Sequence, residues 1–218
     1  MKPTQSTVAN EIRQHFMLFT LALFCLALLM VRAKITQSIY LFFLIWNLFL
    51  AYTPLGLSSL IMNRINLIEK WYFYPAFGCW LLLLPNAPYI ITDFVHLEKE
   101  NNIPLWFDIL LITSFTVCGM LFGLASMKNM YNILSVKFSN KAATVVMATT
   151  CLLSGFGIYL GRFLRYNSWD VLHKPFTLTA DVLHSLIAEE TYKPAWGITI
   201  GFGTLLFLLF RLYYNPEK

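Results

Sequence analysis

The sequence predicts an all-α polytopic integral membrane protein, with six transmembrane helices and a short interfacial amphipathic helix before the last span. Two observations carry this prediction. The 218-residue chain is 58% hydrophobic and 12% charged, whereas a soluble domain has about 45–50% apolar and about 25% charged residues. Long uncharged stretches also separate the charged residues, at 16–31, 35–63, 71–92, 109–127, 142–161 and 194–210.

These stretches match the thickness of a bilayer. A spanning helix needs about 20 mostly apolar residues, with a range of about 17–25. Five stretches reach that length unaided, and the first does so once His15 or Arg32, interpreted as snorkelling to the headgroups, is counted at an end. Buried helices of a soluble bundle would need polar outer faces, and the segment Ser38–Leu50 has none.

The elements follow in order along the chain. The expected spans are 15–31, 38–60, 72–92, 105–127, 143–163 and 196–213, between a short polar lead at 1–14 and a tail at 214–218, so that 15–213 forms one membrane domain. Pro54 and Gly56 predict a kink or an early end in the second span, and Pro88 predicts a kink near the end of the third. Pro104 suits the first turn of the fourth span.

The connection before the last span contains the expected amphipathic helix, at Thr179–Glu190. Thr179 is its candidate cap, and apolar residues recur at helical spacing at Val182, Leu183, Leu186 and Ile187. Asp181, His184 and the glutamates take the opposite face. This pattern predicts a helix that lies in the membrane interface.

Basic residues set the orientation and the class of partner. An even number of spans places both termini on one side, which holds nine of the 16 basic residues, and an excess of Lys and Arg predicts the cytoplasmic side. The basic residues are isolated, so no nucleic-acid partner is expected. The four cysteines lie in different uncharged stretches without metal-ligand spacing and indicate packing rather than a disulfide framework.

On this topology, polar clusters meet at the extracytoplasmic ends of three spans. In the first cluster Asn86, Tyr89, Asp93 and His96 share one helical face. Alternatively, Asn86 and Tyr89 hydrogen-bond to backbone groups that the kink leaves without partners. Asp93 and His96 would then only mark the solvent-exposed end of the span. The second is Asp108, which the helix dipole alone would also explain.

The third cluster closes the fifth span. Arg162 and Arg165 lie one turn apart, and Asn167, Trp169 and Asp170 follow. Paired arginines suit a phosphate, a carboxylate or the aspartates of the other clusters, although snorkelling to lipid headgroups is the alternative. We expect Asp93 to approach Arg162 or Arg165 within salt-bridge reach, because an unpaired buried charge is costly.

The candidate site residues follow from these clusters. Asp93, His96 and Asp170 are the candidate catalytic acids or bases. The candidate ligand-binding residues are Asn86, Tyr89, Asp108, Arg162, Arg165, Asn167 and Trp169. Asp-x-x-His occurs three times, ending at His96, His173 and His184.

Several of these motifs together resemble a known family. They are Leu84–Tyr89, Thr92–Asp93, His96–Leu97, Trp106–Asp108 and Gly161–Asp170. They are similar to the signature of a bacterial multi-pass membrane family of unknown function, DUF1361, over roughly the first to the sixth span. The resemblance implies an integral protein of the bacterial cell membrane and implies no activity; His173 and His184 lie outside its motifs.

Four functional hypotheses remain at this point. The first is a site that binds or modifies a lipid headgroup or other amphiphile, with membrane lipids as partners and no cofactor. The second is a zinc-dependent variant with Asp93 and His96, joined by Asp108 or Asp170, as ligands. The third is an accessory subunit without catalysis. The fourth, a small transporter, is disfavoured because the middles of the spans hold no charge, with Asn47 and Pro54 as the only irregularities.

Overall fold

The computed structural model describes residues 5–64, 69–97, 103–188 and 191–214. Within these ranges the chain forms helices and no strands. Six helices are long and apolar enough to cross a membrane: Arg13–Thr36, Tyr40–Met62, Phe73–His96, Leu105–Lys137, Asn140–Arg162 and Tyr192–Tyr213. The chain is therefore an all-α polytopic membrane protein, as the sequence predicts.

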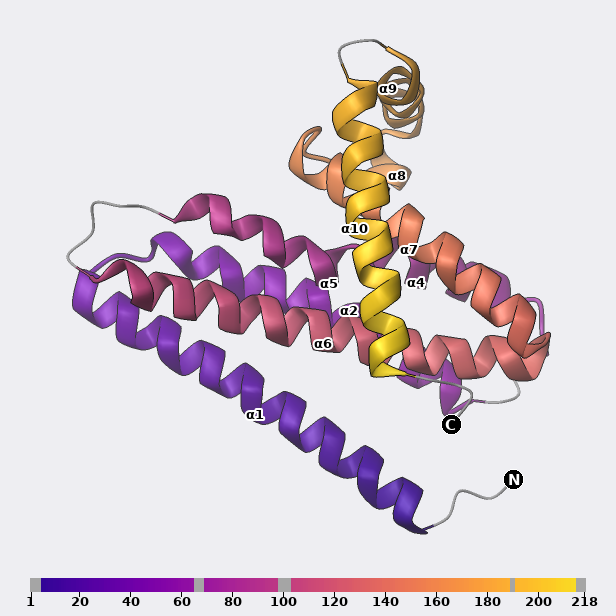
Figure 1. The fold of residues 1–218 in the computed structure, drawn as a ribbon, viewed down its shortest axis with the longest axis horizontal. Helices are drawn as coiled ribbons and strands as arrows, with labels where there is room; N and C mark the ends of the chain where they lie inside the picture. The colour runs from indigo at the N-terminus through magenta and orange to yellow at the C-terminus, as the bar shows by residue number, and fades with distance from the viewer. Residues whose placement is uncertain (1–4, 65–68, 98–102, 189–190, 215–218) are drawn as a thin grey trace.

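The helices are labelled as in Figure 1. Those of the first three spans are α1 (Gln5–Thr36), η1 (Tyr40–Phe42), α2 (Phe43–Met62), α4 (Phe73–Leu83), α5 (Asn86–Tyr89) and the 3₁₀ helix η2 (Ile90–His96). The remaining helices are α6 (Leu105–Lys137), α7 (Asn140–Arg162), α8 (Asp170–His173), α9 (Pro175–Ile187) and α10 (Tyr192–Tyr213).

Several helix boundaries differ from the predicted ones. Helix α1 begins at Gln5, so most of the expected lead is helical, while residues 1–4 and 215–218 lie outside the described part of the chain. Helix α6 continues to Lys137 instead of ending at 127. With 33 residues it is about 50 Å long, which exceeds the hydrocarbon core of a bilayer, about 30 Å thick. Helix α10 begins at Tyr192, ahead of the predicted start at 196.

The second span does not end at its proline. Pro54 lies inside α2, which continues to Met62. A proline leaves the carbonyl four residues earlier without its usual N–H donor. Here the Thr53 hydroxyl donates to that carbonyl, on Leu50, at 2.7 Å. The expectation of an early end is wrong because a neighbouring side chain supplies the missing donor.

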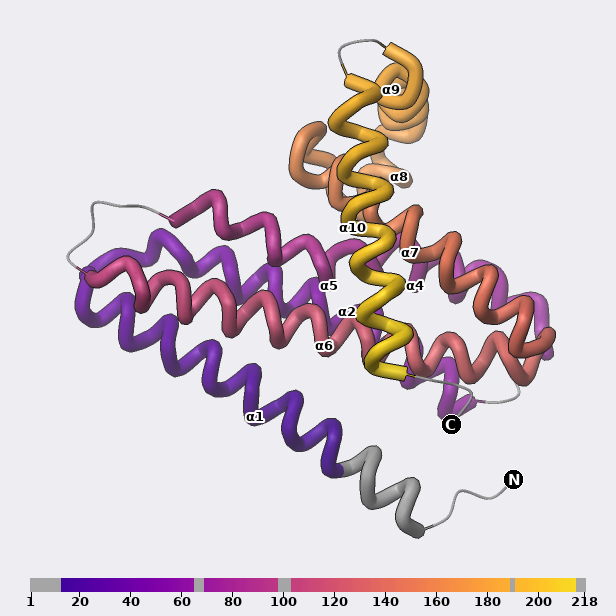
Figure 2. Tube along the Cα trace, in the orientation of Figure 1, coloured from indigo at the N-terminus to yellow at the C-terminus, as the bar shows by residue number. Residues whose placement is uncertain are grey.

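Helix α6 is the common core element. Its Phe115 and Cys118 belong to an apolar cluster with α1 and α2, whereas its Met127 and Leu134 pack in a second cluster with α4, α7 and α10. Figures 1 and 2 show α2 and α6 running alongside each other and α1 running in the opposite direction, with α10 crossing over α6. The first cluster therefore holds the early spans together, and the second joins them to the later ones.

The amphipathic helix before the last span is present but begins earlier than predicted. Helix α9 starts with Pro175 in its first turn, which suits a residue without an N–H donor. Thr179 is therefore not its cap. Leu183 and Ile187 are exposed while Ser185 is buried. The helix ends at Ile187, where Ala188 is extended, so the predicted end at Glu190 is too late. The location of α9 in the membrane interface stays a prediction.

Candidate functional site

The third span is interrupted where the site begins. Helix α4 ends at Leu83, and α5 starts two residues later at Asn86. The interruption leaves backbone carbonyls that need donors. The Asn86 side-chain amide donates to the carbonyl of Leu83 at 2.8 Å, and the Ser168 hydroxyl donates to that of Leu82 at 2.9 Å. Asn86 thus satisfies the break, which is the structural role that the sequence left open for it.

Two glycines of α7 let the fifth span approach this break closely. A Cβ atom on Gly157 would lie 2.6 Å from Cγ of Pro85, and one on Gly161 would lie 3.0 Å from Cε2 of Tyr89. Any larger residue at Gly157 would force the two segments apart. The absence of side chains here brings the end of α7 beside α5 and η2.

Asp93 lies at the centre of this junction. It is 1% exposed. The side-chain amide of Asn47, on α2, donates to its Oδ2 at 2.8 Å. Its Oδ1 lies 4.0 Å from Nη1 of Arg162. The predicted approach of Asp93 to one of the two arginines is confirmed. Asn47 was noticed in the sequence only as a polar irregularity, and its pairing with Asp93 was missed.

His96 follows on the same side of η2. Residues three apart eclipse one another in a 3₁₀ helix, so Asp93 and His96 share a face. Nδ1 of His96 lies 3.4 Å from the hydroxyl of Tyr40. The ring of Phe43 packs against the imidazole edge-on, at 5.0 Å between centroids. Aromatic residues of η1 and α2 therefore hold this imidazole in place.

Asp108 belongs to a different interaction. Arg32, on α1, donates through Nε to Oδ1 of Asp108 at 2.7 Å and through Nη2 to Oδ2 at 3.1 Å. Both side chains are buried, at 3% and 5% exposure. The interpretation of Arg32 as a snorkelling residue is therefore wrong. Asp108 does not line the cavity described below.

The chain after α7 turns back toward the break. Arg165 has a φ of 59°, in the left-handed region, and the next residue, Tyr166, donates its N–H to the carbonyl of Leu160 at 3.1 Å. A non-glycine residue in this conformation costs on the order of 1 kcal/mol. The Tyr166 hydroxyl donates to Oδ2 of Asp181 at 2.6 Å, which ties this loop to α9. That hydrogen bond raises the pKa of Tyr166.

The remaining candidates of this loop have separate positions. Oδ2 of Asp170 accepts the backbone N–H of Asn167 at 2.7 Å and so closes a turn. Trp169 is partly exposed, and neither it nor Asp170 lines the cavity. His173 and His184 are exposed. The structure thus separates the second and third Asp-x-x-His pairs from the junction around Asp93.

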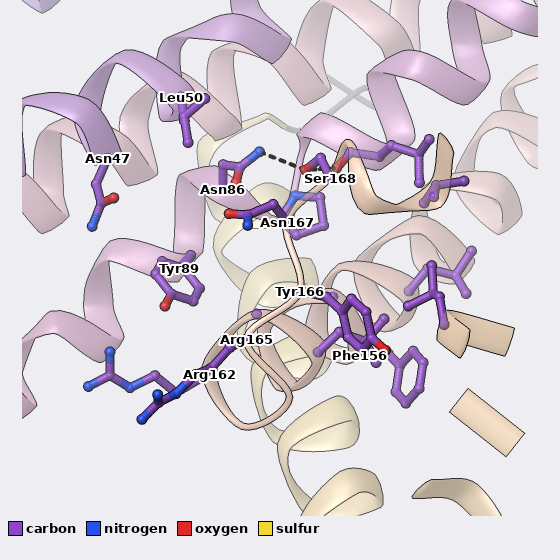
Figure 3. Close-up of a pocket in the computed structure, with 18 of the residues that line it drawn as sticks. Asn47, Leu50, Asn86, Tyr89, Phe156, Arg162, Arg165, Tyr166, Asn167 and Ser168 are labelled. Atoms are coloured by element: carbon purple, nitrogen blue, oxygen red, sulfur yellow. Dashed lines mark hydrogen bonds between the residues drawn. The ribbon is translucent and has the colours of Figure 1, made fainter. Parts of the chain in front are cut away.

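A cavity of about 740 Å³ opens between α2, α4, α5, α7 and the loop after α7. Its wall is apolar over much of its length, through residues that include Leu50, Leu81, Pro85, Phe156 and Leu160. Its polar residues are Asn47, Asn86, Tyr89, His96, Arg162, Arg165, Tyr166, Asn167 and Ser168. Figure 3 shows the side chains of Arg162 and Arg165 extending in the same direction, near Tyr89. The volume falls within the range of about 300–1,000 Å³ that is typical of ligand sites.

The charges around the cavity are unbalanced. Two arginines line it, and no carboxylate is among the described residues that do so. Asp93 contacts Arg162 without lining the cavity itself. The carboxylates of Asp181 and Asp170 accept hydrogen bonds from the lining residues Tyr166 and Asn167. Within the described part of the chain, no three His, Cys, Asp or Glu side chains converge on a point that would suit a metal ion. The arrangement can hold an anion beside an apolar surface.

A family model described as "Protein of unknown function (DUF1361)" matches residues 46–209, about three quarters of the chain. The chain belongs to this family. No characterised protein and no solved structure matches it significantly. The DUF1361 match begins in the second span, so the expected extent from the first span onward is too long. Both arginines, Asp93 and Asp108 lie inside the match, whereas Arg32 lies outside it.

Proposed function

We propose that this protein binds, or modifies, an amphiphile with an anionic headgroup at the extracytoplasmic surface of a bacterial cell membrane. One observation carries the proposal: a cavity of about 740 Å³ combines an apolar wall with two arginines and no lining carboxylate among the described residues. Arginine guanidinium groups bind phosphate or carboxylate oxygens through paired hydrogen bonds. Apolar chains would lie against the leucines and Phe156.

The rim of the cavity supports access from the hydrocarbon. Trp46, Leu82 and Leu153 line the cavity and are also exposed. All three lie within helices that are long and apolar enough to span a membrane, where exposed apolar side chains contact lipid. An amphiphile would therefore reach the arginines laterally, with its chains remaining in the bilayer.

Three residues are candidates for acid–base chemistry, and they differ in whether they line the cavity. His96 lines the cavity, whereas Asp93 and Asp170 do not. A modifying reaction would therefore use the His96 imidazole, which can serve as a general acid or base, as the group that meets the ligand. Asp93 would orient Arg162, and Asp170 would shape the loop.

An accessory subunit that docks through its polar face is the alternative. A docking surface would present Arg162, Arg165 and Asn167 on a flat face. These residues instead line a recess, which favours a small ligand over a protein partner.

The binding proposal is tested by purifying the protein in mild detergent and measuring bound lipid by native mass spectrometry. We expect added phosphatidylglycerol, which is anionic, to raise the unfolding temperature more than zwitterionic phosphatidylcholine does. The double variant R162Q/R165Q should lose this difference. The matched control K174Q removes an exposed positive charge outside the cavity lining and should keep it. Equal stabilisation of the native protein by both lipids would overturn the proposal.

Orientation is proposed with both termini in the cytoplasm, from the nine-to-seven distribution of basic residues. Reporter fusions after Lys137 and after Lys193 should report opposite sides of the membrane, with Lys137 cytoplasmic. The same side for both fusions would contradict the topology. Opposite sides with Lys137 outside would reverse the orientation and place the cavity mouth in the cytoplasmic leaflet.

A further inference from the structure

We infer that Arg165 is the residue that holds the headgroup, through a lipid phosphate, and that Arg162 is a positioning residue fixed by Asp93. This inference rests on the proposed binding of an anionic amphiphile. It assigns different tasks to two arginines that the sequence presents as an equivalent pair.

The two arginines differ first in their partners. Nη1 of Arg162 lies 4.0 Å from Oδ1 of Asp93, and the Arg162 side chain is 23% exposed. Asp93 itself is fixed from the other side by the amide of Asn47, at 2.8 Å. Arg165 also lines the cavity and is exposed, and no residue of the described chain pairs with its guanidinium. Asp93 therefore offsets the charge of Arg162, and Arg165 supplies the positive charge that a ligand would meet.

The backbone at Arg165 points to the same assignment. Its φ of 59° lies in the left-handed region, where glycine is unstrained and is the usual residue at a helix end. The other non-glycine residue with positive φ among those described is Gln37, at 53°. The Gln37 side chain donates to the Lys34 carbonyl at 2.8 Å and so stabilises its own helix end. Arg165 makes no comparable local contact in the described chain, so its side chain serves the cavity rather than the turn.

The ligand chemistry follows from the guanidinium and its neighbours. A guanidinium presents a planar fork of N–H donors that matches two oxygens of a phosphate. Near it the cavity offers neutral groups, including Tyr89 and Asn167, which suit a headgroup with few further charges. With the charge of Arg162 offset by Asp93, the Arg165 guanidinium, which no described carboxylate pairs with, matches the single net negative charge of a lipid such as phosphatidylglycerol.

The test uses glycine to separate binding from folding. Arg165→Gly removes the guanidinium and relieves the strained φ, so the ligand-free protein should unfold at an equal or higher temperature. Its affinity for phosphatidylglycerol, measured by native mass spectrometry in detergent, should fall by about tenfold or more, because a charge-assisted paired hydrogen bond is lost. Arg165→Lys keeps the charge without the planar fork of donors. Its affinity for phosphatidylglycerol should lie between those of the native protein and Arg165→Gly.

Gln37→Gly is the matched control, since it relieves the same backbone strain away from the cavity. It should leave phosphatidylglycerol binding unchanged. Inorganic phosphate at the same concentration should not stabilise the native protein; stabilisation equal to that by phosphatidylglycerol would overturn the assignment to a lipid.

Two failures can be told apart. If the native protein binds phosphatidylglycerol and R165G binds it equally well, the role of Arg165 is wrong and the proposed function stands. If the native protein shows no preference for the anionic lipid, the proposed function itself fails.

Discussion

Among the described residues, two Arg–Asp pairs join spans of this protein, and their geometries differ. Arg32 and Asp108 form two hydrogen bonds, at 2.7 and 3.1 Å, with both side chains buried. Arg162 and Asp93 make one contact at 4.0 Å, and Arg162 is 23% exposed at the wall of a cavity.

The difference separates a fully buried ion pair from one at the wall of the proposed site. In the first pair, the carboxylate and the guanidinium satisfy each other, and little capacity remains for a ligand. In the second, one oxygen of Asp93 accepts from Asn47, and the other holds Arg162 at the wall of the cavity that Arg165 also lines. The pair with the longer contact is the one beside the cavity that we propose as a binding site.

The largest loss of stability should come from breaking the buried pair of Arg32 and Asp108. Asp108→Ala leaves the Arg32 charge buried without its carboxylate, and removing one partner of such a pair costs about 3–5 kcal/mol. We expect a marked loss of folded protein from membranes, measured by detergent-extracted abundance and thermal unfolding.

The exchange variant R32D/D108R serves as its control and should recover part of the lost abundance, because it restores opposite charges. Normal abundance of Asp108→Ala would contradict the structural role of this pair and return Asp108 to the list of ligand-binding candidates.

An intermediate loss of stability is expected at the pair of Arg162 and Asp93. Asp93→Asn removes the charge that faces Arg162 but keeps an oxygen that accepts from Asn47, so the loss of stability should be about 1 kcal/mol or less. Lipid binding should change more than stability, because Arg162 loses the group that orients it. Parallel measurement of unfolding temperature and phosphatidylglycerol affinity distinguishes the two. A loss of folded protein as large as that of Asp108→Ala would mean that both pairs are structural.

The smallest effect should come from the loop that carries Arg165. Tyr166→Phe removes the hydrogen bond to Asp181 and should increase amide hydrogen exchange in α9 without lowering abundance. The bond raises the pKa of Tyr166 above its ordinary 10.0, so its contribution is complete below pH 10 and is lost as pH rises through the raised value. Native protein should therefore show the faster exchange of α9 only in strongly alkaline buffer, once the intrinsic exchange rate is subtracted. Unchanged exchange in the variant would show that this bond does not hold the loop.

Local patterns explain which parts of the site were predictable. Arg162, Arg165 and Asp93 were identified because polar residues at the ends of apolar spans must meet at one level of the membrane. The pairing of Asp108 was missed, although Arg32 ends the first span at the same level, because Arg32 was interpreted as reaching the headgroups. Asn47 gave only a weak signal, since a single amide in a span has many possible partners.

The sequence by itself determined the class and the number of spans, because charged residues are excluded from hydrocarbon and separate the apolar stretches. It did not determine where each helix ends, since α1 includes Arg13 and α6 continues past Lys128. It also predicted which polar residues gather at one membrane surface, from the alternation of spans. Only the tertiary structure decided that Arg32 pairs with Asp108. It also decided that Asp93 contacts Asn47 and, of the two arginines expected near it, Arg162. Those choices depend on how closely helices approach, here through Gly157 and Gly161 against Pro85 and Tyr89. Contacts between side chains from different spans are set by that packing, which no local pattern in the chain specifies.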